Sequence, residues 1–264
     1  MPPAVPPAVS RSFKVLLPIF LVMTVFSILN YLLTRISPGG LNALIYNLLQ
    51  APLKDMGTNI VTVLILSVVA NFLWVLGIHG PNTVAAIRET VFSEANLENL
   101  SYAASHGETW GAPYPFTWTS VNDAFANYGG SGMTLGLLIA IFIASRRKDF
   151  RDMAKMAFVP GLFNINEPII FGLHIVLNPI MVIPFVLVPV VTSLIGYFAV
   201  TLEIIPPVAY AIPWTTPGPL IAFFGTGGNW IALIVGLLCL AVATLIYLPF
   251  VIAANSVNKK IASV

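Results

Sequence analysis

The chain has 264 residues, of which 58% are hydrophobic and only 8% are charged, and its mean hydropathy is +0.91. Soluble domains carry about 25% charged residues, so the composition excludes a soluble globular protein and predicts an all-α polytopic membrane protein. A net charge of +2 gives no reason to expect a nucleic-acid partner, and no cofactor or metal-ligand set is predicted. Cys239, the sole cysteine, lies in an apolar run and is expected to be a small buried side chain.

The first part of the chain predicts a linker, a membrane span and an interfacial helix. Residues 1–12 are proline-rich and typical of a linker. The apolar run at 15–33 is long enough to cross a bilayer, which takes about 20 residues. Residues 41–56 mix Leu and Ile with Asn, Gln and Lys at helical spacing, which predicts an amphipathic helix along the interface. A second apolar run follows at 58–77.

The motif IHGPN, at residues 78–82, interrupts this second run. Gly80 and Pro81 break a helix, while His79 and Asn82 supply polar groups. A lone histidine after an apolar helix is more often structural than a ligand. Paired interrupted segments are, however, the best sequence indication of a transporter binding site, so a second interruption elsewhere makes the motif a candidate site.

Residues 83–128 are the most polar section, and the topology of the chain from 58 to 130 stays open. The cluster WGAPYPFTW at 110–118 suits either a membrane interface or a surface on which a sugar ring packs. An apolar run at 129–145 then leads to SRRKDFRDMAK at 145–155. This is the densest basic patch of the chain, and the positive-inside rule places it in the cytoplasm.

The second interruption is FNINEPIIFG at 163–172, in which Glu167 is the only acidic residue between positions 153 and 202. A carboxylate at the centre of a membrane helix costs about 2.5–3.5 kcal/mol, so such groups usually face a cavity or a partner. Pro168 removes a backbone donor and is expected to push Glu167 away from helical geometry. The segment therefore predicts a helix break that lines a cavity, with a solvated turn between two spans as the alternative.

Two further apolar spans are predicted, at 177–200 and 230–254. A chain that leaves the cytoplasm near Lys155 and returns at Lys259 crosses the membrane twice, and these spans supply both crossings. The Glu167 segment is therefore expected to enter and leave on one side as a re-entrant hairpin.

The stretch FNINEPIIFGLHIVLNP resembles the membrane (IIC) subunit of the bacterial phosphotransferase system (PTS), in its lactose/cellobiose/diacetylchitobiose branch. IHGPN, the basic loop and IPWTTPGP at 212–219 follow in the order that this family shows. The resemblance implies a membrane-embedded domain, at 13–264, that binds a β-linked disaccharide between two re-entrant hairpins and carries it across the bacterial inner membrane by an elevator-like movement. Family members are usually longer, so the chain is expected to hold the C-terminal transport half without the N-terminal oligomerisation half.

The resemblance also implies partners and roles for residues. The IIA and IIB subunits, membrane lipid and a second copy of the permease are the expected partners, and IIB would donate a phosphoryl group from its cysteine to the C6 hydroxyl of the sugar. Glu167 would hydrogen-bond that hydroxyl and act as its catalytic base, and His79 would contact the sugar in the same pocket. Asn82 and Asn166 are candidates for binding sugar hydroxyls, and Trp214 for packing on a ring.

Two other hypotheses stay open. The chain is a non-transporting remnant or one half of a split permease, or it is a proton- or ion-coupled transporter in which Glu167 is the titrating group. A remnant has no physical need of a carboxylate within the membrane. An ion-coupled transporter would bind sugar with strong pH dependence and without IIB. No residue pattern discriminates cellobiose, diacetylchitobiose and lactose as the substrate.

Overall fold

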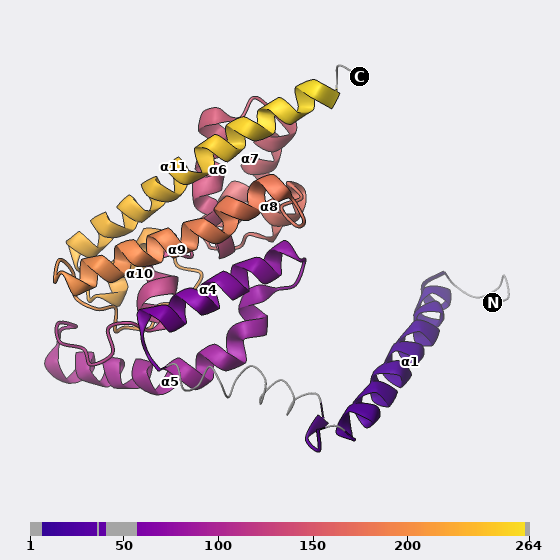
Figure 1. Cartoon of the computed structure of the whole chain (residues 1–264), viewed down its shortest axis with the longest axis horizontal. Coiled ribbons are helices and arrows are strands. Elements are labelled where there is room, and N and C mark those ends of the chain that lie inside the picture. Colours follow the sequence, from indigo (N-terminus) through magenta and orange to yellow (C-terminus); the bar gives the residue numbers. More distant parts are fainter. Residues whose placement is uncertain (1–6, 36, 41–56, 262–264) are drawn as a thin grey trace. The chain divides into compact units, whose positions relative to one another are not determined.

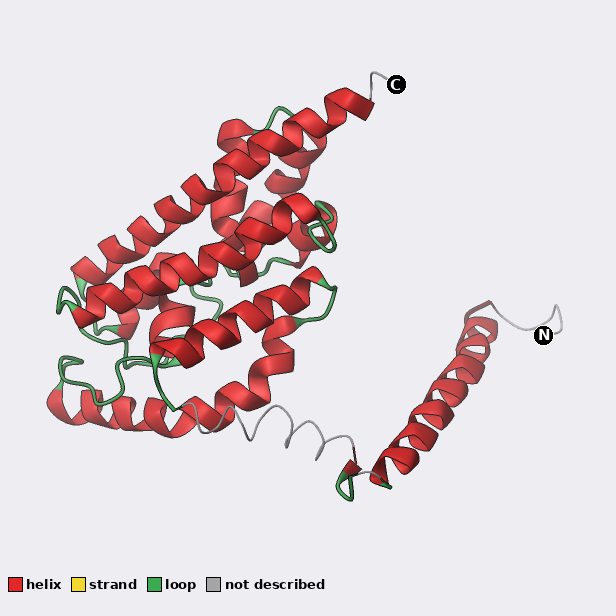
Figure 2. Cartoon of the chain, in the orientation of Figure 1, coloured by secondary structure: helices red, strands yellow, loops and turns green. Residues whose placement is uncertain are grey.

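The computed structural model describes residues 7–35, 37–40 and 57–261, and within these ranges it contains helices and turns without a β-strand (Figures 1 and 2). This confirms the prediction of an all-α chain. The chain divides into two compact units, Met1–Asp55 and Met56–Val264. The amphipathic helix predicted at 41–56 lies outside the described residues.

The first unit contains one long apolar helix, α1 (Pro7–Thr34). It begins inside the stretch that was predicted to be a linker, because prolines are tolerated in the first turn, where the missing N–H has no partner to lose. Lys14–Thr34 has 21 residues with a mean hydropathy of 2.2, sufficient to span a membrane. Its apolar side chains are exposed, as Phe20 is to 68%, which suits a lipid environment.

The second unit holds the other helices that the structure describes. These are α4 (Ile60–Val75), α5 (Gly80–His106), the π-helix η2 (Trp118–Asp123), the short 3₁₀-helix η3 (Ser131–Met133), α6 (Thr134–Ala144), α7 (Lys148–Leu162), α8 (Glu167–Gly172), α9 (Pro179–Thr201), α10 (Gly218–Gly225) and α11 (Trp230–Ile261). Helix α9 packs against both α4 and α11, and α11 also packs against α6 (Figure 1).

Two helices of the second unit are long and apolar enough to cross a membrane. They are α9, with a mean hydropathy of 2.2, and α11, whose apolar part Trp230–Asn255 has a mean hydropathy of 2.8. Helix α9 continues through Pro184 and Pro189. The apolar runs predicted at 58–77 and 129–145 form the shorter helices α4 and α6. Each is shorter than the roughly 20 residues that a transmembrane helix needs.

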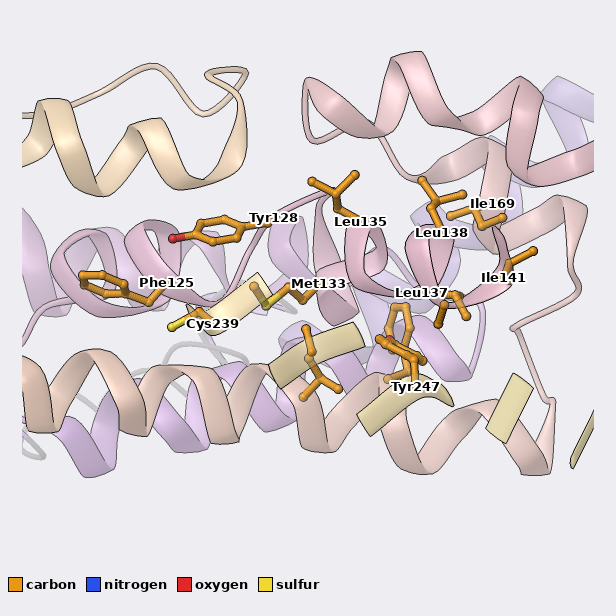
Figure 3. Packing of buried hydrophobic residues seen from close by; sticks show 14 of the residues in the cluster. Phe125, Tyr128, Met133, Leu135, Leu137, Leu138, Ile141, Ile169, Cys239 and Tyr247 are labelled. Atoms are coloured by element: carbon orange, nitrogen blue, oxygen red, sulfur yellow. The ribbon is translucent and has the colours of Figure 1, made fainter. Parts of the chain in front are cut away.

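The core of the second unit lies between α6, α9 and α11 (Figure 3). Phe125, Leu138 and Tyr247 are completely buried there. Cys239 is also buried and free, as the sequence predicted. The buried Tyr247 hydroxyl donates a hydrogen bond of 2.6 Å to the carbonyl of Gly132. This bond fixes the chain just before α6.

The helix pair α4–α5 is joined by a tight turn at residues 76–79. A Cβ atom on Gly80 would lie 1.7 Å from the carbonyl oxygen of Ala70, so only glycine allows the two helices to approach this closely. The break after α7 has a different cause. There Asn164 adopts a left-handed conformation with φ +63°, and α8 starts three residues later.

Candidate functional site

A cavity of about 900 Å³ opens where the two helix breaks meet. This volume is within the range of about 300–1,000 Å³ that small-molecule sites occupy. Its wall combines residues from the end of α4, α5 as far as Asn96, η2, the loop at 127–131, the break before α8 with the start of α8, and the irregular segment before α10. All five residues singled out in the sequence line it: His79, Asn82, Asn166, Glu167 and Trp214.

His79 and Glu167 face each other across the cavity although 88 positions separate them. Nε2 of His79 lies 4.0 Å from Oε1 of Glu167, and both side chains are partly exposed. Nδ1 of His79 accepts a hydrogen bond of 3.3 Å from the backbone N–H of Asn82, since His79 is the N-cap of α5. A singly protonated ring therefore carries its hydrogen on Nε2, which faces the carboxylate.

Glu167 owes its position to the break between α7 and α8. It is the first residue of α8 rather than part of the break itself, so the expectation that Pro168 pushes it out of helical geometry is not met. Pro168 occupies the first turn of the helix, where its missing N–H has no helical partner to lose. The backbone bend is instead supplied by Asn164, which the sequence analysis did not single out.

Asn164 ties three segments of the cavity wall together. Its Oδ1 accepts a hydrogen bond of 2.8 Å from the N–H of Gly129. Its Nδ2 donates to the carbonyls of Trp214, at 2.6 Å, and Thr216, at 2.9 Å. The side chain is buried, so these bonds satisfy polar groups that water does not reach. Asn164 therefore positions the loop that carries Trp214, whose own side chain is 61% exposed.

Two more asparagines hold the glycine-rich loop at 129–132. Nδ2 of Asn166 donates a hydrogen bond of 3.0 Å to the carbonyl of Ser131, and Oδ1 of Asn71 accepts one of 2.7 Å from the N–H of Gly132. Gly130 has φ +89°, and a Cβ there would lie 2.8 Å from Nδ2 of Asn166. Asn166 is thus buried and engaged in holding the wall, in addition to lining the cavity.

Trp74 is a cavity residue that the sequence analysis missed. Its ring centroid lies 4.5 Å from that of His79, with the rings tilted by 48°. The indole Nε1 is buried and makes no hydrogen bond to the described residues. The available signal was its place at the end of α4, four positions before the start of IHGPN. Arg88 and Asp123 also line the cavity and were not anticipated either.

Hydrogen bonds tie the aromatic–proline cluster at 110–118 to α5, and Phe116 packs on Tyr197 of α9. Tyr102 donates a hydrogen bond of 2.8 Å to the carbonyl of Trp110, and Asn99 bonds both backbone groups of Tyr114, at 2.7 Å and 2.9 Å. Trp118 is buried, with the Arg88 guanidinium 5.6 Å from its ring centroid. No residue at 110–118 lines the large cavity, so the idea of a sugar-packing surface in this cluster finds no support there.

Apolar helices of membrane-spanning length, in a unit with a polar, partly open cavity, are typical of helical membrane transport proteins. The chain belongs to the PTS EIIC family. The family described as "Phosphotransferase system, EIIC" matches residues 1–189.

Relatives of this chain fit the branch that the motifs predicted. The chain is 33% identical over 276 residues to the "PTS system cellobiose-specific EIIC component" of Lactococcus lactis subsp. lactis (strain IL1403), covering 98% of this chain and 56% of the relative. It is 32% identical over 254 residues to the "PTS system lactose-specific EIICB component" of Staphylococcus haemolyticus (strain JCSC1435), covering 95% of this chain and 42% of the relative.

A solved structure is also similar, namely that of the transporter ChbC, the IIC component from the N,N'-diacetylchitobiose-specific phosphotransferase system. The TM-score is 0.73 at 34% identity, over 100% of this chain and 60% of that one. The chain therefore spans about half the length of the curated relatives it matches.

Proposed function

We propose that this chain binds a β-linked disaccharide of the cellobiose or diacetylchitobiose type and translocates it for phosphorylation at C6 by IIB. The observation that carries the proposal is the gap of 4.0 Å between Nε2 of His79 and Oε1 of Glu167. This separation is too long for a direct hydrogen bond. It fits one hydroxyl group that accepts from the histidine and donates to the carboxylate.

The same geometry supports a role for Glu167 as general base. In the proposed reaction the C6 oxygen of the sugar attacks the phosphorus of phosphocysteine on IIB. The P–S bond breaks, the sulfur leaves as a thiolate, and the hydroxyl proton passes to the carboxylate of Glu167. A general base works within hydrogen-bond reach of the proton that it takes, and the bridging position satisfies this. His79 orients the hydroxyl oxygen for the attack.

The rest of the wall supplies what a neutral sugar needs, namely apolar ring faces and amide groups. Trp74 and Trp214 offer aromatic surfaces on which a pyranose ring packs, and the buried N–H of Trp74 is an unused donor beside His79. Asn82 is exposed to the cavity and is proposed to bond a sugar hydroxyl. Asn166 is proposed to do so while it also holds Ser131.

We also propose how the chain lies in the bacterial inner membrane. Helices α9 and α11 are the crossing spans, and the exposed basic residues at the start of α7 face the cytoplasm. The α4–α5 turn and the α7–α8 break are the tips of two re-entrant hairpins, with His79 at one and Glu167 at the other. Their elevator-like movement carries the sugar. IIA, IIB and a second copy of the permease are its partners, in line with the EIICB name of one relative.

The test is calorimetric titration of the purified chain in detergent with cellobiose, diacetylchitobiose and lactose. Saturable binding of one sugar, weakened at least tenfold in both Glu167→Gln and His79→Ala, is the expected result. Glu98→Gln and His106→Ala are matched controls, since neither residue lines the cavity. A folded, monodisperse sample that binds none of the sugars would instead favour the remnant or split-permease hypothesis. Sugar binding that changes strongly with pH would favour the ion-coupled transporter.

A further inference from the structure

The cavity has a second polar region, away from the His79–Glu167 pair. Arg88 lies on α5 nine residues after His79, which corresponds to about 13 Å along the helix. Asp123 joins Arg88 in the cavity wall, from the end of η2. Both residues line the same cavity of about 900 Å³, which has room for a second sugar ring beside one held at His79 and Glu167.

Asp123 sits in unusual local structure. It ends η2, a π-helix, a rare form that occurs often at functional sites. The helix is fixed at its start by a reciprocal pair of hydrogen bonds between Thr117 and Ser120. Asp123 is half-buried and also lines a small neighbouring cavity of about 40 Å³, together with Asn71 and Asn122. That space is large and polar enough to hold a water molecule.

Arg88 is held in place by contacts with residues other than Asp123. Its Nη2 lies 3.3 Å from Oε1 of Glu89, and its guanidinium stands over the ring of Trp118. Among the described residues it forms no ion pair with Asp123, although both line the same cavity. Burial raises the pKa of Asp123 from 3.8 to about 6, while the positive charge of Arg88 acts in the opposite direction. The side chains of Asn122 and Trp118 also interact with the carboxylate and act to lower its pKa. A carboxylate has about four lone-pair sites and a guanidinium has five N–H donors, so each group still has positions for a ligand.

The wall around this pair is also braced. Nδ2 of Asn96 on α5 donates a hydrogen bond of 3.3 Å to Oγ1 of Thr119 on η2, and both residues line the cavity. This bond joins the two elements that carry Arg88 and Asp123. The spacing between guanidinium and carboxylate is thereby set by the fold rather than by a bound ligand.

We infer that Arg88 and Asp123 form the subsite for the sugar ring that is not phosphorylated. The carboxylate of Asp123 accepts a hydrogen bond from one ring hydroxyl, and Arg88 donates to the oxygen of its neighbour. A donor and an acceptor side by side match the vicinal hydroxyls of a pyranose. The subsite thus selects a disaccharide over a monosaccharide. This inference rests on the proposed function, whose sugar site it extends.

The experiment compares a disaccharide with its monosaccharide. Radiolabelled cellobiose is bound to the detergent-solubilised chain and displaced by unlabelled cellobiose or by glucose, for the wild type, Asp123→Asn, Arg88→Lys and Glu167→Gln. Asp123→Asn keeps the size of the side chain, and Arg88→Lys keeps the charge but loses the planar fork. Asp152→Asn is the matched control, because Asp152 is exposed on α7 and does not line the cavity.

We expect Asp123→Asn and Arg88→Lys to weaken cellobiose about tenfold or more and glucose less than twofold. Glu167→Gln should weaken both sugars. If the two subsite variants bind cellobiose within twofold of the wild type while Glu167→Gln does not, the subsite is refuted and the proposed function stands. If Asp123→Asn lowers the affinity for glucose and for cellobiose by the same factor, the subsite is also refuted. A wild-type chain that binds neither sugar would overturn both.

Discussion

Replacing Asn164 by alanine should destabilise the second unit and loosen the cavity wall together. The substitution removes the three hydrogen bonds that join Gly129, Trp214 and Thr216 to one side chain. At about 1 kcal/mol for each net hydrogen bond, their loss costs about 3 kcal/mol. The left-handed backbone, at φ +63°, adds about 1 kcal/mol for alanine. The expected total is about 4 kcal/mol, a large share of the stability of a single domain.

The glycine variant separates the two contributions. Asn164→Gly loses the same hydrogen bonds but tolerates the left-handed conformation, so it should be about 1 kcal/mol more stable than Asn164→Ala. Reversible chemical unfolding in detergent micelles, followed by tryptophan fluorescence, measures both free energies. Because the Trp214 loop loses its anchor, sugar affinity should fall in both variants as well. An Asn164→Ala protein within about 0.5 kcal/mol of the wild type would refute the anchoring role of Asn164.

Three other variants test separate parts of the structure. Gly80→Ala places a Cβ 1.7 Å from the Ala70 carbonyl, so unfolding should show a loss of about 3 kcal/mol or more. Asp123 binds a proton more tightly in the folded chain, with a pKa raised from 3.8 to about 6 by burial. The wild type should therefore lose up to about 3 kcal/mol of stability as pH rises through that window, and Asp123→Asn should not. Trp214→Ala, at an exposed position, should leave unfolding unchanged and weaken sugar binding about fivefold.

The positions of both helix breaks were predictable, although the cause of the second break was not. Gly80 and Pro81 end one apolar run, and the Asn-Glu-Pro motif follows a second break, so both interruptions could be located in the sequence. That His79 and Glu167 meet was predicted through the family resemblance and not from spacing, since 88 positions separate them. Helix α1 begins inside the predicted linker, because prolines in the first turn carry no penalty.

The residues that were missed act through contacts that a single sequence does not display. Asn164 precedes Glu167 by three positions, yet its role depends on the carbonyls of Trp214 and Thr216, which lie 50 and 52 positions further along the chain. Asp123 belongs to the most polar section, where Glu94 and Glu98 are exposed. Asp123 differs from such surface carboxylates in that it ends the π-helix η2 and lines the cavity, and the sequence does not display either property.

The proposed function depends most on one sugar hydroxyl that bridges His79 and Glu167, and deoxy analogues of the sugar probe this bridge. Two analogues of cellobiose, each lacking the 6-hydroxyl of one ring, are titrated by calorimetry into the wild type and into Glu167→Gln. We expect one analogue to bind the wild type at least tenfold more weakly than cellobiose. In Glu167→Gln the same analogue should lose much less affinity relative to cellobiose, because the bond to the carboxylate is already lost and only the bond from His79 remains. The bridge does not exist if both analogues bind the wild type as tightly as cellobiose does. It also does not exist if removal of the hydroxyl lowers affinity by the same factor in Glu167→Gln as in the wild type.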